Sequence, residues 1–414
     1  MPVRPPIASL TGLRFVAAIC VVVPHGLLQL VPFPAEQPAW YTTLTQASAI
    51  GMSLFFVLSG FVIHYNYSSA IREGKLRGLL GFFVARFARL YPLYILCVVF
   101  SLAATWWHGN LRQWGGALPY YLLMMQSWVY GVIGDNNLIY QYGLMIPVTW
   151  SISTEWFFYA AYPAVCFLIL RLGGLLAKLL AAGALCLIEF LGLYWTFANY
   201  QAINQFGVEN FGPVADIASH WQDSFIRWLV YFSPYSRIGE FVIGCFAAAI
   251  SMQLQDRRVT PGEARFGSAL LLAALAGMAV LYRLMFGPPY SAPPFTFVTY
   301  LHLSFGFAPL VGVVIFCCAR YRSWLSSALS VPLIVQCGEV SYGVYLLHPL
   351  VFRAFVPRAS PITDGAAEAL DLALLAVAVV ATIAASFASY GLWERPMRRL
   401  IRGAFGSGLR RAAA

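Results

Sequence analysis

Two ionisable residues in one apolar stretch are the first candidates for chemistry. Arg14 and His25 both lie in LTGLRFVAAICVVVPHGLLQL, residues 10–30. On a helix they share one face, and their depths in a bilayer differ by roughly 16 Å. Ionisable side chains within a membrane usually face a polar interior, so the pattern predicts a functional site. The alternative is a helix kinked at Pro24 whose histidine only bonds a neighbouring helix.

A pair of arginines in ARFARLYP is the second candidate. Arg86 and Arg89 share one face of a helix that the sequence predicts to begin near Arg89 and to cross to Trp107. Two guanidinium groups on one face suit a phosphate or pyrophosphate. The alternative is ordinary anchoring of the helix by arginines at the inner membrane surface.

A third candidate opens the helix predicted over residues 150–171. Ser151 and Glu155 lie one turn apart in PVTWSISTEWFFYAAYP, and Trp150 is beside them. A carboxylate placed here can orient a histidine or a substrate hydroxyl. Alternatively, Ser151 lies near the cap and Glu155 satisfies amides of the first turn.

Two later segments carry further polar residues. Arg237 and Glu240 in YSRIGEFVIGC favour a structural ion pair, and His348 in EVSYGVYLLHPLVF shares a helical face with Ser341. Taken alone, His348 is more typical of a hydrogen-bonded core histidine than of a ligand. The remaining histidines look interfacial or loop-borne, and no role is expected for them: His64, His108, His220 and His302.

The composition places these candidates in a membrane. Of 414 residues, 60% are hydrophobic and only 10% are charged, which is too little charge to cover a soluble protein of this length. Several apolar stretches approach or exceed the roughly 20 residues that span a bilayer. The sequence therefore predicts an all-α, polytopic transmembrane helix bundle. The eight cysteines all fall in apolar runs, so disulfides are not expected.

The distribution of charge gives the orientation. The net charge is +10, but the basic residues cluster in short loops between apolar runs, which indicates the positive-inside pattern and not nucleic-acid binding. The apolar segment 118–128 is too short to cross the bilayer, and the polar segment 198–223 is predicted to be an outer loop. We expect about ten crossings with both termini cytoplasmic. Residues 1–400 form the transmembrane domain in this interpretation, and 401–414 form a basic cytoplasmic tail.

Taken together and in order, these segments resemble the acyltransferase-3 family of bacterial integral membrane proteins, which modify surface and extracellular carbohydrates. The resemblance covers most of the chain. The matching segments are LTGLRFVAAICVVVPHG, SLFFVLSGFVI, RFARLYPLY, TWSISTEWFFYAAYP, RIGEFVIG, EVSYGVYLLHPLVF and WERP. No HExxH, P-loop, GxSxG, GxGxxG or HxxxxD motif competes with this resemblance.

The resemblance implies an activity and roles for particular residues. It implies transfer of an acyl group, usually acetyl, from acyl-CoA to a sugar hydroxyl of a glycan or glycolipid. His25 takes the family's catalytic histidine position, Arg14 matches its arginine, and Arg86 with Arg89 match its donor-side pair. Ser53 stands where many members carry an acid.

From both lines of reasoning we expect a multi-pass O-acyltransferase of the bacterial plasma (inner) membrane. Its expected partners are acyl-CoA, a glycan or glycolipid acceptor and the lipid bilayer. No bound cofactor, metal ion or nucleic acid is expected. The expected catalytic residues are His25, Arg14 and Glu155, and the expected donor-binding residues are Arg86, Arg89, Trp150, Ser151 and His348.

Several alternatives stay open at the level of sequence. His25 can act as a general base or form a transient acyl-histidine. The acceptor can be an O-antigen, an exopolysaccharide, a periplasmic glucan or a small glycoside. The alternative interpretation from a different class of protein is a polytopic transporter or glycolipid flippase, with a buried pathway lined by Arg14 and His25.

Overall fold

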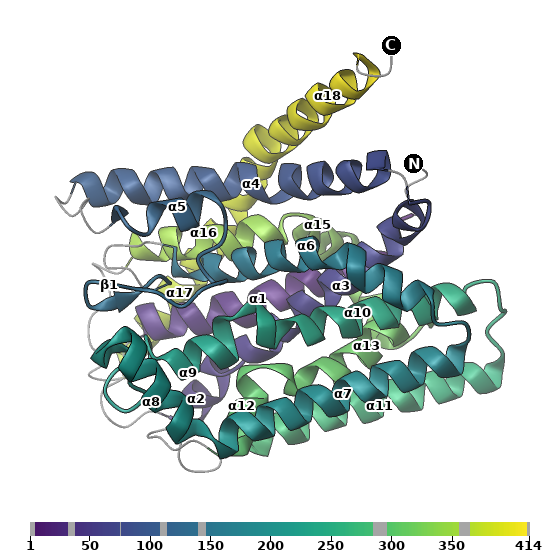
Figure 1. Ribbon diagram of the computed structural model, residues 1–414, viewed down its shortest axis with the longest axis horizontal. Coiled ribbons are helices and arrows are strands. Elements are labelled where there is room, and N and C mark those ends of the chain that lie inside the picture. Colours follow the sequence, from purple (N-terminus) through teal and green to yellow (C-terminus); the bar gives the residue numbers. More distant parts are fainter. Residues whose placement is uncertain are drawn as a thin grey trace.

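The structure is a computed structural model, and it describes residues 5–31, 38–74, 76–107, 114–139, 146–284, 296–355 and 365–411. Nearly all of this part of the chain is helical (Figure 1). One small hairpin pairs β1 (Val132–Ile133) with β2 (Asn136–Asn137), and it is the only sheet among the described residues. The predicted all-α class is confirmed.

Within the described residues, eight helical segments are long and apolar enough to cross a membrane. They are formed by α1 (Ala8–Leu30), α2 (Ala39–Thr45) with α3 (Ser48–Arg72), α4 (Leu76–Trp107), α6 (Trp150–Leu170), α7 (Leu175–Ala198), α9 (Phe225–Arg227) with α10 (Pro234–Leu254), α11 (Pro261–Leu284), and α17 (Gly365–Ser389) with α18 (Arg395–Arg411).

Two predicted crossings are broken helices. The ninth is made of α12 (Phe297–Leu303) and α13 (Ala308–Arg320), which meet at an angle of 79°. The crossing that the sequence predicts over residues 333–355 is divided into α15 (Pro332–Glu339) and α16 (Ser341–Arg353), with only Val340 between them, and this pair is not among the segments long and apolar enough to span. The described residues therefore contain eight candidate spans, or nine with the bent pair, where about ten crossings were predicted. The chain is therefore a multi-pass membrane protein, and short α14 (Trp324–Leu329) links these two regions.

Two helix boundaries predicted from the sequence are wrong, and one predicted loop contains a helix. Helix α4 begins at Leu76 and not near Arg89, because apolar residues between the basic ones extend its helical pattern. The second apolar segment of the sequence predicts a helix over residues 44–65, whereas helix α3 continues to Arg72. The polar segment 198–223 contains α8 (Tyr200–Phe211), whereas 118–128 forms only the short α5 (Leu118–Leu122).

Helices α3 and α10 approach each other closely at the centre of the bundle. A Cβ atom added to Gly60 would lie 1.9 Å from the carbonyl oxygen of Phe241, and one added to Gly244 would lie 2.0 Å from that of Val57. Only glycine fits at such a backbone contact, which is typical of packed membrane helices. Helix α1 lies against α3, so the segments that carry Arg14 and His25 belong to the buried centre.

Helices α7 and α11 both lie at the lower edge of the bundle in the view of Figure 1. No residue in the apolar window of α7 is buried, and Leu180 and Ile188 are 64% and 66% exposed. Apolar side chains exposed to this extent are stable only against lipid. The polar candidates for chemistry lie on the inner helices.

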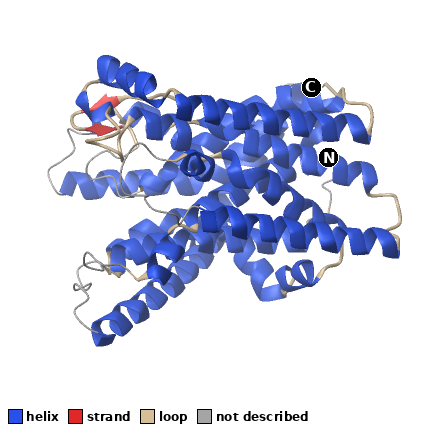
Figure 2. Cartoon of the chain, turned by 90° about the horizontal axis from the view of Figure 1, so that it is seen from below, coloured by secondary structure: helices blue, strands red, loops and turns tan. Residues whose placement is uncertain are grey.

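The two ends of the bundle differ. The hairpin, α5 and α8 lie at one end, whereas the start of α1 and the helix α18 lie toward the opposite end (Figures 1 and 2). The basic residues Arg72, at the end of α3, and Arg77, at the start of α4, flank the connection between these helices. Following the positive-inside pattern, we name the end with these arginines the inner end and the hairpin end the outer end.

Candidate functional site

Four arginines line a chamber at the inner end, which we name the basic chamber. It holds about 640 Å³ between α1, α3, α4 and α18. Arg14 comes from α1, Arg86 and Arg89 from α4, and Arg402 from α18. No acidic residue is found among the described residues that line it. Such a concentration of guanidinium groups without carboxylates suits a ligand with several negative charges.

A narrower space, the middle chamber, follows toward the centre of the bundle. It holds about 70 Å³, and Arg14, Arg86 and Arg89 line it as well as the basic chamber. Because the three arginines belong to both, they form the neck between the two spaces. Glu155 and Ser151 from α6 line the middle chamber from the other side.

The polar contacts of the middle chamber fix its side chains. Glu155 Oε1 accepts a hydrogen bond of 2.7 Å from Ser59 Oγ and another from the Tyr159 hydroxyl. Arg86 is 7% exposed, donates to the Tyr67 hydroxyl at 2.7 Å, and lies with its guanidinium carbon 4.8 Å from the centre of that ring. Glu155 therefore holds side chains of the chamber instead of capping amides of its own helix.

His25 lines a separate space at the outer end, the outer chamber, which holds about 260 Å³. Trp150, Tyr231 and Arg227 line it too. The rings of Trp150 and Tyr231 lie 5.0 Å apart, and the Arg227 guanidinium carbon lies 5.9 Å from the Tyr231 ring. Aromatic faces beside a polar side chain are suited to bind a sugar ring and its hydroxyl groups.

Met52 and Tyr345 separate the middle chamber from the outer one, because both residues line both spaces. The Tyr345 hydroxyl donates to the Val148 carbonyl at 3.0 Å, and because its single proton is used there, it accepts from Ser151 Oγ, 2.8 Å away. The three chambers thus follow one another from the inner end to His25, with one thin partition before the histidine.

His25 forms a pair with His348. His25 Nδ1 lies 2.9 Å from His348 Nε2, and His348 Nδ1 lies 2.6 Å from the carbonyl oxygen of Tyr345. That carbonyl is free to accept because Pro349, four residues later, has no N–H to donate within the helix. His348 is fully buried, and it lines none of the three chambers.

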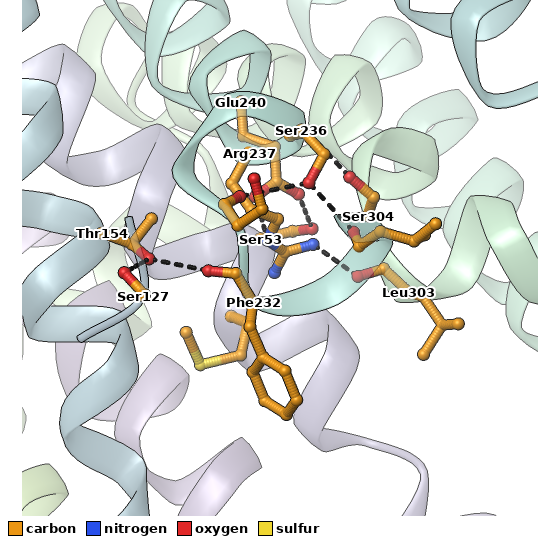
Figure 3. Close-up of polar contacts among 12 residues, drawn as sticks. Ser53, Ser127, Thr154, Phe232, Ser236, Arg237, Glu240, Leu303 and Ser304 are labelled. Carbon is orange, nitrogen blue, oxygen red and sulfur yellow. Dashed lines mark hydrogen bonds and ion pairs between the residues drawn. The ribbon is translucent and has the colours of Figure 1, made fainter. Parts of the chain in front are cut away.

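A buried polar cluster supports the walls of these chambers (Figure 3). Arg237 Nε lies 3.4 Å from Glu240 Oε2, and Ser53 Oγ donates to Glu240 Oε1 at 2.6 Å. Arg237 also donates to the Leu303 carbonyl at 2.7 Å, where α12 ends and the chain bends. Its guanidinium carbon lies 5.0 Å from the ring of Phe56, which lines the middle chamber. The predicted structural ion pair is confirmed.

We expect Glu240→Gln to destabilise the protein strongly. The substitution leaves the buried charge of Arg237 without its carboxylate, and breaking a buried pair in this way costs about 3–5 kcal/mol. Thermal unfolding of the detergent-solubilised protein measures the effect. Glu263→Gln is the matched control, because Glu263 pairs with Arg320 but is 29% exposed. Equal losses in the two variants would contradict the account of the cluster.

The structure sorts the residues predicted from the sequence into two groups. Arg14, Arg86, Arg89, Ser151 and Glu155 meet in the middle chamber. Trp150 lies with His25 on the outer chamber, and His348 lies against His25 instead of beside the arginines. Their donor-binding roles remain predictions, and the positions of Trp150 and His348 suit the histidine end of the site better.

Two histidines were misplaced by the sequence reasoning, and two residues that line the chambers were missed. His64 and His302 are 1% and 6% exposed, so both are buried residues of helices, α3 and α12, and not loop-borne; His108 lies outside the described residues. The sequence reasoning also missed Tyr345 and Arg402, which line the chambers. Tyr345 precedes His348 by one turn in the segment YLLHP, and that spacing was the available signal.

Comparison with known proteins supplies the family. The model of a family described as an acyltransferase domain matches residues 7–391. The acyltransferase MdmB of Streptomyces mycarofaciens is 30% identical over 391 residues, which cover 90% of this chain and 88% of MdmB. The peptidoglycan O-acetyltransferase OatA of Listeria monocytogenes is 24% identical over 402 residues, 95% of this chain but 56% of OatA. No solved structure matches.

Proposed function

The chain belongs to the acyltransferase-3 family, and from that premise we propose that it transfers an acyl group, acetyl in the first instance, from acyl-CoA to a sugar hydroxyl of a surface polysaccharide, glycolipid or glycoside. The observation that carries this proposal is the succession of chambers. An arginine-lined space at the inner end leads through a narrow neck to a partition with His25 behind it.

The charge and shape of the inner spaces support coenzyme A as the donor. Its phosphates carry several negative charges on one end, and its pantetheine arm is thin and uncharged. Arg14, Arg86 and Arg89 at the neck suit the pyrophosphate. The arm then fits the middle chamber and brings the thioester toward Tyr345 and His25.

Hydrogen bonding sets the tautomer of His25. The Tyr345 carbonyl can only accept, so neutral His348 carries its proton on Nδ1 and has a lone pair on Nε2. His25 Nδ1–H then donates to that lone pair, and the lone pair of His25 Nε2 remains available. This is the arrangement that a general base needs.

The transfer follows from that lone pair. His25 Nε2 takes the proton of the sugar hydroxyl while its oxygen attacks the thioester carbon. The tetrahedral intermediate collapses, the C–S bond breaks, and the coenzyme A thiolate leaves and receives the proton from the His25 imidazolium. The alternative passes through an acyl-histidine: Nε2 attacks the thioester carbon first, the C–S bond breaks, and the coenzyme A thiolate leaves. The sugar hydroxyl then attacks the acyl carbon, the bond to Nε2 breaks, and the proton of the hydroxyl passes through the freed Nε2 to the thiolate.

The position of the chambers also supports transfer from one side of the bilayer to the other. The donor enters from the inner end, whereas the outer chamber lies near the start of α6 and the end of α1. In this arrangement the acyl group passes the partition and the acceptor stays outside. We place the protein in the bacterial plasma (inner) membrane because its relatives MdmB and OatA come from bacteria.

Removing the arginines at the neck is expected to weaken donor binding. Arg86→Gln and Arg89→Gln should each raise KM for acetyl-CoA by about tenfold, the effect of losing one hydrogen bond to a charged group. Initial rates at varied acetyl-CoA concentration measure KM. Arg77→Gln is the control, because Arg77 lies on the same helix, is exposed and lines no chamber. A KM unchanged in all three variants would contradict the proposed donor site.

Labelled donor tests the function as a whole. Inside-out membrane vesicles from cells that produce the protein are mixed with acetyl-CoA labelled in the acetyl group, and label in the glycan and lipid fractions is measured. We expect label only with the protein present, and far less with right-side-out vesicles, which hide the inner end. Equal labelling with and without the protein would refute the proposed activity.

A further inference from the structure

The C-terminal helix contributes to the basic chamber. Helix α18 packs against α4, and four of its arginines have side chains that the structure describes: Arg395, Arg398, Arg399 and Arg402. Arg398 pairs with Glu394 at 3.5 Å, and Arg395 lies 5.6 Å from the ring of Tyr390. Of the four, only Arg402 lines the basic chamber, where Phe405 lies one turn after it.

Arg402 occupies a different depth from the other three arginines of the chamber. Arg14, Arg86 and Arg89 line both the basic and the middle chamber, whereas Arg402 and Phe405 line the basic chamber alone. The middle part of a long ligand that extends from the inner end toward His25 therefore lies at the neck, between Arg14, Arg86 and Arg89. The far end of the ligand remains beside Arg402.

The charges of coenzyme A follow the same order. The thioester is at the thin end, the pyrophosphate lies in the middle, and the adenosine with its 3′-phosphate is at the far end. The walls of the basic chamber also include the aromatic residues Tyr65 and Phe405, which offer ring surface to a base. Three arginines at the neck and one beyond it match a pyrophosphate and one further phosphate.

We propose that Arg402 binds the 3′-phosphate of the coenzyme A donor, which makes α18 part of the donor site and not only a basic tail. This inference rests on the proposed function. The other role open to a basic helix at the inner surface is attraction to anionic lipid headgroups. Lipid attraction depends on the summed charge of the helix, so it does not distinguish Arg402 from Arg399.

The test compares three ligands on the purified full-length chain in nanodiscs of phosphatidylcholine. Isothermal titration measures the affinity for coenzyme A, for dephospho-coenzyme A, which lacks the 3′-phosphate, and for pantetheine. We expect Arg402→Gln to weaken coenzyme A binding by about tenfold and to leave the other two affinities within about twofold. Arg399→Gln, which removes the same charge from an exposed position on the same helix, should change none of them.

The outcomes separate this inference from the proposed function. Unchanged coenzyme A binding by Arg402→Gln, with normal binding by the wild type, overturns the role of Arg402 alone. An equal loss for dephospho-coenzyme A, or an equal loss in Arg399→Gln, also overturns it, since neither depends on the 3′-phosphate. If the wild-type protein binds no coenzyme A, the donor proposal fails and this inference fails with it. If both variants bind phosphatidylglycerol vesicles more weakly than the wild type while coenzyme A binding is unchanged, α18 binds lipid headgroups and the proposed role of Arg402 is wrong.

Discussion

His25→Gln is expected to lower kcat for acyl transfer by about 10²–10⁴-fold, the contribution of a positioned general base. Glutamine keeps a polar group beside His348 but cannot take a proton from a hydroxyl. Arg14, Arg86 and Arg89 line chambers that His25 does not reach, so the affinity for acyl-CoA should remain within about twofold. Rates and donor binding measured on the same preparation check both parts.

Chemical rescue separates chemistry from structure at this position. The outer chamber of about 260 Å³ is large enough to admit imidazole beside the space left in His25→Ala. Added imidazole should therefore restore part of the rate in that variant and none in His25→Gln. His220→Gln, at an exposed histidine in the outer region, is the control and should keep full activity. Wild-type turnover by His25→Gln would show that the histidine has no chemical role.

His348→Leu is expected to lower kcat by about ten- to a hundredfold, because His25 loses the acceptor that fixes its tautomer and orientation. KM for the donor should not change, since His348 lines none of the chambers. Separate measurement of kcat and of KM for the donor tests this expectation. His348 is a positioning residue in this account, because it acts through His25.

A second substitution at the same position distinguishes positioning from packing. His348→Gln keeps a group that can donate to the Tyr345 carbonyl and accept from His25, so it should recover part of the rate lost in His348→Leu. Both variants must be present in the membrane at the wild-type level. If leucine and glutamine cause the same loss, or if leucine causes none, the hydrogen-bonded pair does not set the activity of His25.

The sequence predicted the bundle well because hydrophobicity alone separates membrane helices from loops. The boundary errors arose where charge and helix coincide: Arg86 and Arg89 were expected to mark the start of a helix, but α4 begins at Leu76. The long polar stretch 198–223 was expected to be a loop, although α8 lies within it. Polarity predicts contact with water, and it does not predict the absence of helix.

The candidate site was predicted in parts. Helical periodicity placed Arg14 and His25 on one face, and the structure shows that this face opens into two different chambers. The partition between them comes from Met52 and Tyr345, on other helices, which periodicity within α1 cannot predict. The contact between His25 and His348 joins residues 323 positions apart. Such pairs depend on how the helices pack, and a single sequence contains no direct signal for them.

The most direct test of the account is the O-acyl content of the surface glycans, measured by NMR in cells that lack this protein and are complemented with the wild type or with His25→Gln. Membrane levels of the two proteins must be equal. The account predicts that the wild type restores the ester signals and that His25→Gln does not. Full restoration by His25→Gln would contradict the mechanism. Absence of ester in both strains would instead favour the transporter or flippase. The chambers would then line a pathway across the membrane and would not be a site of acyl transfer.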